Sequence, residues 1–140
     1  MIHVQKINRA KDLELAFEIR RKVFVIEQRV DPKEEYDEFE VSSTHYLALE
    51  GHRALGTARW RKTDYGTKLE RFAVLEEARS KGVGKALVLK CLEDVPKDGS
   101  PIYLHAQVQV IPFYEKLGFE TIGDEFVEAE IRHKKMVYKP

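Results

Sequence analysis

The sequence predicts a mixed α/β fold with helices on both faces of one β-sheet, and three observations support this prediction. Short segments in which apolar and polar residues alternate, as in strands, lie between segments with apolar residues at helical spacing. Their order is strand, helix, three strands, helix, strand, helix and two strands, which is typical of a layered α/β domain. The length of 140 residues suffices for one domain with a proper core and is too short for two. We therefore treat residues 1–140 as a single domain.

The first half of the chain is expected to form one helix and four strands. The helix begins at Asn8 and ends at Glu27, with its apolar residues on one side and with Asn8 or Asp12 available as its cap. A stretch with Pro32, six acidic and two basic residues then breaks the helical pattern. The strands are expected at residues 2–7, 45–50, 54–62 and 68–75.

The second half is expected to form two helices and three strands. One helix spans residues 82–95 and directly follows a strand. The other spans residues 109–117, with Pro112 in its first turn, where a missing N–H costs little, and with Gly118 as its stop. The strands are expected at residues 102–107, 119–123 and 130–138.

The composition excludes several classes of function. Lysine and arginine together number 24, as do aspartate and glutamate, so no overall charge recruits nucleic acid or an anionic membrane. The apolar runs are far shorter than the roughly 20 residues that span a bilayer, and the N-terminus has no signal-peptide pattern. The one cysteine, Cys91, is expected to be a buried, reduced thiol, and five scattered histidines do not indicate a metal site. We therefore expect a cytoplasmic protein without metal.

A glycine-containing loop joins the strand at 68–75 to the following helix and has the pattern Arg79-x-x-Gly82-x-Gly84. Free N–H groups at a helix N-terminus bind phosphate, and glycines let the backbone approach an anion. A Walker A loop is excluded because Ala86 replaces the required serine or threonine, and a dinucleotide fingerprint is excluded by Leu87. The pyrophosphate loop of an acyl-coenzyme A domain and a plain strand–helix turn both fit this spacing.

Two further segments carry a resemblance to a known family. The segment AQVQVIPFYEKLGF at residues 106–119 resembles the later motif of the GNAT superfamily of N-acetyltransferases. It lies at the appropriate distance after RFAVLEEARSKGVGKAL, which includes the glycine loop. The segment RRKVFVIEQRVDPKEEYDE is similar to the first helix and following loop of the ElaA-like branch. The resemblance extends over nearly the whole chain.

This resemblance implies a GNAT-like, mostly antiparallel sheet of about six to seven strands with helices on both faces. The sheet would splay at its centre between residues 69–75 and 101–106, and the pantetheine arm of acetyl-CoA would lie in that gap as a surrogate strand. Backbone groups of Phe72 and Val74 would pair with the arm and the thioester carbonyl, while the N–H groups of the glycine loop hold the pyrophosphate. The implied cofactor-binding residues are Phe72, Ala73, Val74, Arg79, Ser80, Lys81, Gly82, Val83, Gly84, Lys85 and Gln107. Gln107 stands where many family members have asparagine.

Tyr114 matches the residue to which the resemblance assigns the role of general acid, protonating the departing thiolate. Its spacing from Val110, Phe113 and Leu117 is also that of a buried helix face, so a core tyrosine is the alternative interpretation.

The base that deprotonates the amine has two main candidates. Glu27 ends the first helix, near where the family places the acceptor pocket. His105 faces away from its apolar neighbours on the strand at 102–107 and could point into the splay. Glu70, His45 and a relay through water are further possibilities, and each side chain could instead be a paired structural group.

The acidic run from Asp31 to Glu40 has three interpretations: a solvated loop, a pocket rim that attracts a cationic amine, or a set of carboxylates held by Arg71. The chain end departs from the ElaA-like pattern G-I-P-H-x-x-M. Residues 130–136 keep His133 and Met136 but lack the glycine and the proline, so the turn into the last strand is expected to differ.

These features together predict an acetyl-CoA-dependent N-acetyltransferase that transfers the acetyl group directly to a primary amine. The acceptor is a small molecule or a peptide, no nucleic acid or membrane takes part, and the protein is a monomer or a homodimer. One alternative is a non-catalytic acyl-CoA sensor, which would keep Arg79, Gly82 and Gly84 but need neither Tyr114 nor a base. Another is a nucleotide-binding regulatory domain that prefers ADP or NAD.

Overall fold

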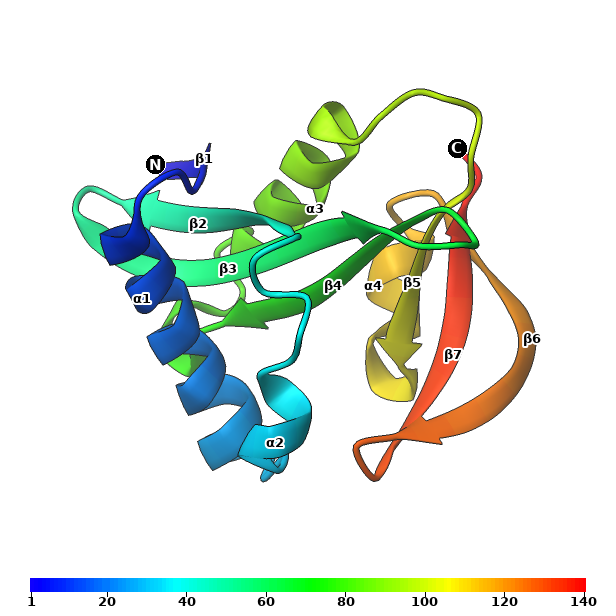
Figure 1. The fold of residues 1–140 in the computed structure, drawn as a ribbon, viewed down its shortest axis with the longest axis horizontal. Helices are drawn as coiled ribbons and strands as arrows, with labels where there is room; N and C mark the ends of the chain where they lie inside the picture. Colours follow the sequence, from blue (N-terminus) through cyan, green and yellow to red (C-terminus); the bar gives the residue numbers. More distant parts are fainter.

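The computed structural model describes residues 1–140 and has at its centre a seven-stranded sheet of order β1-β2-β3-β4-β5-β7-β6 (Figure 1). Neighbouring strands are antiparallel except β4 and β5, which are parallel. The strands are β1 (Ile2–Lys6), β2 (Thr44–Glu50), β3 (Arg53–Lys62), β4 (Thr67–Val74), β5 (Ile102–Gln107), β6 (Phe119–Glu128) and β7 (Ile131–Tyr138). This is the mixed, mostly antiparallel α/β fold that the sequence predicted.

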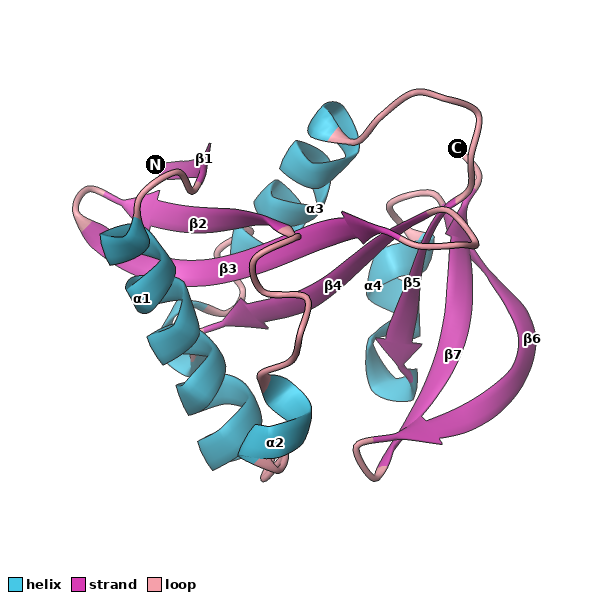
Figure 2. Ribbon diagram, viewed as in Figure 1, coloured by secondary structure: helices cyan, strands magenta, loops and turns pink.

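Helices and short helical turns connect these strands (Figure 2). The α-helices are α1 (Ala10–Arg20), α2 (Pro32–Glu35), α3 (Val83–Asp94) and α4 (Ile111–Glu115). A π-helical segment η1 (Arg21–Glu27) continues α1, and the 3-10 turns are η2 (Glu76–Ala78) and η3 (Val108–Val110). None of the helices combines the length and apolar composition that a bilayer-spanning segment needs.

Two hydrophobic cores explain why helices cover both faces of the sheet. On β2, the successive residues Tyr46 and Leu47 are both fully buried, but they belong to different cores because neighbouring strand residues point to opposite faces. The first core joins α3 and α4 to the sheet through residues such as Leu87 and Tyr114, and the second joins α1 and η1 through residues such as Ile19. In Figure 1, α1 lies on the near side of the sheet and α3 on the far side.

Three details differ from the sequence prediction. The predicted caps of the first helix are wrong: Arg9 is the N-cap without a side-chain bond, and Asp12 instead accepts hydrogen bonds from the Arg9 guanidinium. The helix expected at 109–117 is shorter, because a 3-10 turn precedes α4. β6 runs to Glu128, well past the predicted end at Gly123, where the backbone has a positive φ of 78° within the strand.

β4 and β5 pair over three residues only and then separate, as the resemblance implied. The paired residues are Thr67–Leu69 on β4 and Ile102–Leu104 on β5. Beyond them, Figure 1 shows the two strands diverging. A bulge in β4 accompanies the separation, since the register with β3 shifts after Glu70 and Arg71 has a φ of 58°. From the bulge to the end of β4, the edge that would face β5 has no strand beside it.

The tip of the β6–β7 hairpin closes one side of this gap. Its two turn residues, Ala129 and Glu130, have φ values of 51° and 63°, the left-handed region that favours glycine. Glu130 is the position at which the ElaA-like pattern has glycine. Ala129 and Ile131 pack against the second core, so the tip reaches toward the segment that follows η1.

Candidate active site

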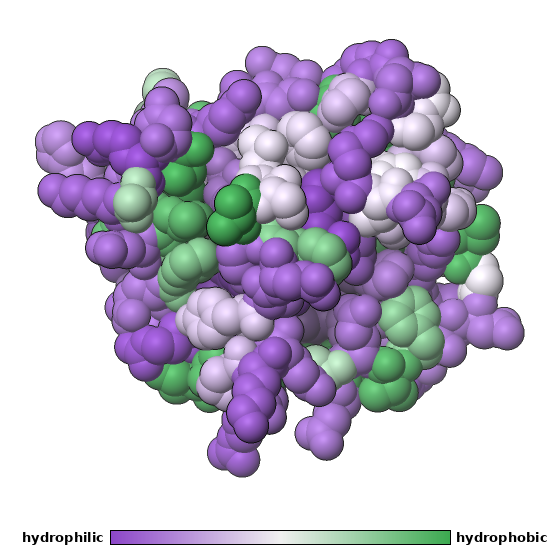
Figure 3. All heavy atoms as spheres, viewed as in Figure 1, coloured by the Kyte–Doolittle hydropathy of each residue, from purple (hydrophilic) through white to green (hydrophobic).

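A cavity of about 840 Å³ occupies the gap between β4 and β5, and its size is that of a cofactor or drug-sized ligand. β4, β5, the turn before α3, helix α4, the β6–β7 hairpin and the α2 segment all contribute lining residues. Seen from the side of α1 and α2, the molecular surface is mostly hydrophilic and is recessed between α2 and the hairpin (Figure 3).

At one end of the cavity, the turn before α3 presents free backbone N–H groups. The first helical hydrogen bond of α3 runs from the Ala86 N–H to the Gly82 carbonyl at 3.0 Å. The N–H groups of Val83, Gly84 and Lys85 therefore have no partner within the helix, and the positive end of the helix dipole adds to their attraction for an anion. The loop expected from the sequence thus has the geometry of a phosphate-binding turn.

The two glycines of this turn differ in backbone conformation and surroundings. Gly82 has a φ of 81° and open space where a Cβ would stand, so glycine is favoured there by backbone conformation. A Cβ on Gly84 would stand 3.4 Å from the Phe113 ring, an ordinary van der Waals contact, so neither space nor backbone conformation requires glycine there. Ser80 also has a positive φ, 71°, which sequence patterns did not indicate.

Arg79 and Glu27 form an ion pair beside this turn. The terminal nitrogens of Arg79 lie 2.6 and 2.7 Å from the two Glu27 oxygens, and its Nε and Nη2 also donate to the Val74 carbonyl. The hydrogen bonds from Arg79 lower the pKa of the Glu27 carboxyl below its ordinary value. Glu27, a candidate base, is therefore bound to the cofactor loop and does not line the cavity.

Tyr114 lies in the first core with its hydroxyl directed to the cavity. Its ring packs edge-on against Phe72 of β4, Phe113 and Phe119, and burial raises the pKa of the phenol. The Tyr114 hydroxyl makes no hydrogen bond to protein. Because every fully buried side-chain polar atom has a hydrogen-bond partner, this hydroxyl is not fully buried, and we infer that its exposed surface faces the cavity that Tyr114 lines. The helix face that the sequence suggested as buried is only partly so: Tyr114 belongs to the core, but Val110 and Phe113 are 38% and 37% exposed.

On the opposite wall, His105 belongs to a cluster with three residues of the hairpin, Phe126, Glu128 and His133. Its Nδ1 lies 3.3 Å from Glu128 Oε1, and its ring packs edge-on against Phe126. His133 Nε2 lies 3.8 Å from the other Glu128 oxygen, while its Nδ1 is 2.7 Å from the Ile131 carbonyl. The bond with His105 lowers the pKa of Glu128. Glu128 escaped the sequence prediction because β6 was expected to end five residues earlier.

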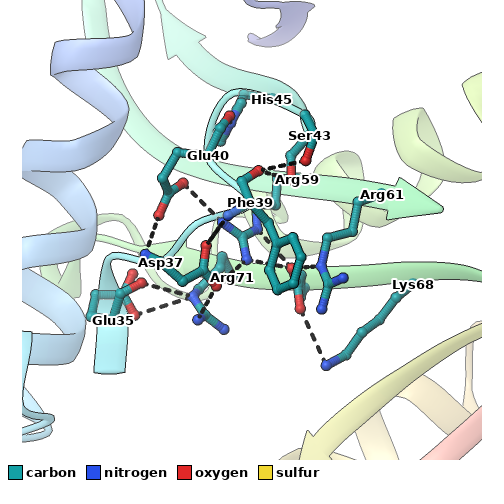
Figure 4. A network of polar contacts seen from close by, with 12 residues as sticks. Glu35, Asp37, Phe39, Glu40, Ser43, His45, Arg59, Arg61, Lys68 and Arg71 are labelled. Atoms are coloured by element: carbon teal, nitrogen blue, oxygen red, sulfur yellow. Dashed lines mark hydrogen bonds and ion pairs between the residues drawn. The ribbon is translucent and has the colours of Figure 1, made fainter. Parts of the chain in front are cut away.

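A buried ion network lies beside the cavity, where β3 and β4 meet the acidic segment (Figure 4). Arg59, which is 0% exposed, bonds to Asp37 and Glu40 at 2.8 Å and also contacts Glu70. Although burial alone would raise the pKa of Asp37, hydrogen bonds from Arg59 lower it to about 2.

The same network holds three of the six carboxylates of the acidic run. Arg20 bonds to Glu35 and Glu40, and Arg71 lies 3.3 Å from Glu35 and 3.2 Å from Asp37. The interpretation in which arginines, Arg71 among them, hold carboxylates of the run is therefore confirmed for these three, whereas Glu34 forms no ion pair and lines the cavity.

The remaining residues predicted from the sequence divide into those that line the cavity and those that do not. Gln107 lines the cavity and donates to Gln28 of η1 at 2.9 Å, which ties the two sides of the gap together. Of the implied cofactor residues, Ala73 is buried in the second core and Lys81 lies outside the cavity, whereas the others line it. The further base candidate His45 is buried near the Glu40 carbonyl and is also outside the cavity.

A split sheet, a free strand edge and an anion-binding helix N-terminus thus open into one cavity. This combination is typical of an acyltransferase that uses a coenzyme A thioester, because it accommodates an extended amide-bearing arm and a pyrophosphate together.

The chain belongs to the GNAT acetyltransferase family, since the family profile described as "Acetyltransferase (GNAT) domain" matches residues 10–140. The Bacillus subtilis protein called uncharacterized N-acetyltransferase YjcF is 42% identical over 130 residues, with 91% of this chain and 92% of YjcF covered. The crystal structure of Escherichia coli ElaA has a TM-score of 0.88 and 27% identity, covering 99% of this chain and 100% of ElaA. A Bacillus subtilis acetyltransferase in complex with CoA, 19% identical, has the same fold with a TM-score of 0.72 and coverage of 100% and 99%. The resemblance to the ElaA-like branch is thereby confirmed.

Proposed function

We propose that residues 1–140 act as one N-acetyltransferase domain that transfers an acetyl group from acetyl-CoA directly to a primary amine of a small molecule or peptide. One observation carries the proposal: the free edge of β4, the free N–H groups of α3 and the Tyr114 ring line the same cavity. Membership in the GNAT family supports it, as does the CoA complex of a protein with the same fold.

The cleft residues fit acetyl-CoA. The N–H groups of Val83, Gly84 and Lys85 suit the pyrophosphate, and the backbone of Phe72 and Val74 suits the pantetheine arm as an added strand. When bound, acetyl-CoA supplies the acetyl group as a reactive thioester. A backbone N–H from the free edge of β4 can then stabilise the negative charge that develops on the carbonyl oxygen.

Tyr114 is the proposed general acid. Because burial raises the pKa of its phenol, the hydroxyl keeps its proton at neutral pH and can give it to the sulfur as the C–S bond breaks. The rings of Phe72, Phe113 and Phe119 fix its orientation and exclude water.

His105 is the proposed general base, removing the proton of the ammonium so that the amine lone pair can attack the carbonyl carbon. With Glu128 on its Nδ1 side, the Nε2 atom is left for the amine, and the ring lines the cavity. Glu27 is assigned to hold Arg79 at the cofactor loop.

Direct transfer is proposed because the one cysteine of the chain does not line the cleft and is not available for an acyl-enzyme. Cys91 is fully buried in α3, and burial raises the pKa of its thiol, which disfavours the reactive thiolate.

The cofactor assignment is tested by thermal unfolding of the protein with acetyl-CoA, CoA, ADP and NAD in parallel. A ligand at a hundred times its Kd stabilises the native state by about 2.7 kcal/mol. We expect both forms of coenzyme A to raise the melting temperature and NAD to leave it unchanged. A shift with NAD or ADP alone would favour the nucleotide-binding alternative, and no shift at all would leave the glycine loop as a plain turn.

Tyr114→Phe then separates an enzyme from a sensor. For an enzyme, kcat for CoA thiol release with an amine should fall by about 10²-fold or more, while the Kd for acetyl-CoA stays the same. The matched control is Tyr65→Phe, which removes a hydroxyl outside the cavity. No thiol release by the unmodified protein with any amine, despite tight binding of acetyl-CoA, would identify the sensor.

A further inference from the structure

Two cationic side chains stand at the closed end of the cavity, where β4 and β5 separate. Arg61 at the end of β3 and Lys68 at the start of β4 are opposite each other in the antiparallel pair, and both line the cavity. The Arg61 side chain is only 16% exposed, and its guanidinium carbon lies 3.8 Å from the centre of the Phe39 ring. Both side chains form ion pairs with the Glu70 carboxylate.

Their hydrogen-bond donors are only partly used. Arg61 Nε donates to Glu70 Oε2 at 2.8 Å, but its two terminal nitrogens make no hydrogen bond to protein. Lys68 Nζ lies 3.2 Å from Glu70 Oε1 and makes no other ion pair. Every fully buried side-chain nitrogen has a hydrogen-bond partner, so the unbonded nitrogens of Arg61 and Lys68 are at least partly exposed. Both residues line the cavity, where a ligand can accept hydrogen bonds from these nitrogens.

Within the ion network at this end of the cavity, cations outnumber carboxylates by one, and the Glu34 carboxylate lines the cavity outside that network. In the connected network, five cationic side chains share four carboxylates. The cations are Arg20, Arg59, Arg61, Lys68 and Arg71, and the carboxylates are Glu35, Asp37, Glu40 and Glu70. Across the cavity, the Glu128 carboxylate is engaged with His105 and His133. A half-buried guanidinium with two free NH₂ groups matches the geometry of a carboxylate or a phosphate.

We propose that the amine acceptor also carries an anionic group, a carboxylate or a phosphate, and that Arg61 and Lys68 bind this group. The inference rests on the proposed acetyltransferase function and narrows its substrate class. It differs from the cationic acceptor suggested by the acidic run, since Glu35, Asp37 and Glu40 of that run are bound to arginines.

The strand geometry also indicates the shape of such an acceptor. Lys68 precedes Phe72, beside the proposed thioester position, by four residues on β4, which corresponds to at most roughly 13 Å because the bulge at Arg71 lies between them. The long side chains of Arg61 and Lys68 shorten this separation but do not remove it. The amine and the anionic group of the acceptor therefore lie several bonds apart, as in an ω-amino acid, a short peptide or a phosphorylated amine.

The experiment compares matched acceptors in a CoA thiol-release assay at saturating acetyl-CoA. One series pairs ω-amino acids, from glycine to 6-aminohexanoate, with their uncharged amides, and a second pairs phosphoethanolamine with ethanolamine. We expect kcat/KM to be at least about tenfold higher for the charged member of a pair, since a hydrogen bond to a charged group is worth a factor of this order. The two series distinguish carboxylate from phosphate.

Variants then locate the effect. Arg61→Gln keeps one polar contact near Glu70 but removes the free fork, and Lys68→Met removes the ammonium at similar length. Each should raise KM for the charged acceptor about tenfold, while KM for its uncharged partner and the Kd for acetyl-CoA stay unchanged. Arg53→Gln is the matched control, because Arg53 pairs with Glu77 on the surface outside the cavity.

The possible outcomes are distinct. Equal kcat/KM for charged and uncharged members, or a preference for the uncharged ones, overturns this inference and leaves the acetyltransferase function standing. A preference that persists in both variants overturns the assignment to Arg61 and Lys68. Absence of thiol release with every amine overturns the proposed function and this inference with it.

Discussion

Replacing Arg59 with methionine tests whether the buried ion network holds the acidic segment in place. Arg59 has no exposed surface and bonds to Asp37, Glu40 and Glu70. Methionine has a similar length but no charge, so the three carboxylates lose their common partner, while each keeps a contact with another cation. Removing one member of a buried ion pair costs about 3–5 kcal/mol, and these remaining contacts favour the lower end of that range.

The pKa of Glu70 gives a second measure of this loss and its pH dependence. Burial alone would raise this pKa, but Arg59, followed by Lys68 and Arg61, lowers it from 4.5 to about 2. Since the folded-state pKa lies below the unfolded one, the ion pairs stabilise the fold above about pH 4.5, and this contribution disappears as the pH falls toward 2. The difference corresponds to about 3 kcal/mol at neutral pH, shared among the three cations.

Urea unfolding at pH 7 and pH 3 measures both quantities. We expect Arg59→Met to lower the unfolding free energy by about 3–5 kcal/mol at pH 7, and by about half as much at pH 3. The control is Arg53→Met, which removes an exposed surface ion pair and should change little. A loss below about 1 kcal/mol at pH 7 would refute the reasoning, because it would mean that the ion pairs of Arg59 contribute little to stability. An equal loss at both pH values would also refute it, because the contribution would then not depend on ionised carboxylates.

Three further substitutions address the turns around the cleft. Glu130→Gly relieves a positive φ of 63°, and we expect the unfolding free energy to rise by about 0.5–1 kcal/mol in urea unfolding; a decrease would mean that the side chain stabilises the hairpin tip. Gly82→Ala places a Cβ at a φ of 81° in open space, so thermal unfolding should show a loss of about 1–2 kcal/mol from backbone strain alone, and an unchanged melting temperature would contradict this. Glu27→Gln leaves Arg79 without its carboxylate and should raise KM for acetyl-CoA severalfold with kcat unchanged. A large fall in kcat at constant KM would instead identify Glu27 as the base.

The sequence predicted the strands well where burial marked them and poorly where it did not. β5 was predicted residue for residue, because its short apolar run is buried against α3 and α4. β6 was predicted too short because, after Phe119, its residues are mostly exposed and give no alternating pattern. Its length is instead set by backbone pairing with β7, which a single-strand pattern does not reveal.

The residues of the candidate site also divide into those that the sequence predicted and those that it did not. The glycine turn before α3 and Tyr114, which both line the cavity, were found from the sequence because each lies in a short contiguous motif. The pairing of Arg79 with Glu27 joins residues far apart in sequence, and the partners of Arg61 and Arg59 likewise depend on how β3 and β4 meet the acidic segment. A local sequence pattern shows that such a residue is charged, but it does not show which residue is its ion-pair partner. The positive φ of Arg71, a residue type with no preference for that region, was equally invisible.

The short parallel seam between β4 and β5 has a mechanical consequence. Backbone hydrogen bonds join the four-stranded part of the sheet to the three-stranded part over only three residue pairs. Side-chain packing in the first core also holds the two parts together, and Leu69 and Leu104 contribute to it from either side of the seam. Both leucines line the cavity as well. A methyl group added or removed at either position would therefore change the packing across the seam and the width of the cavity together.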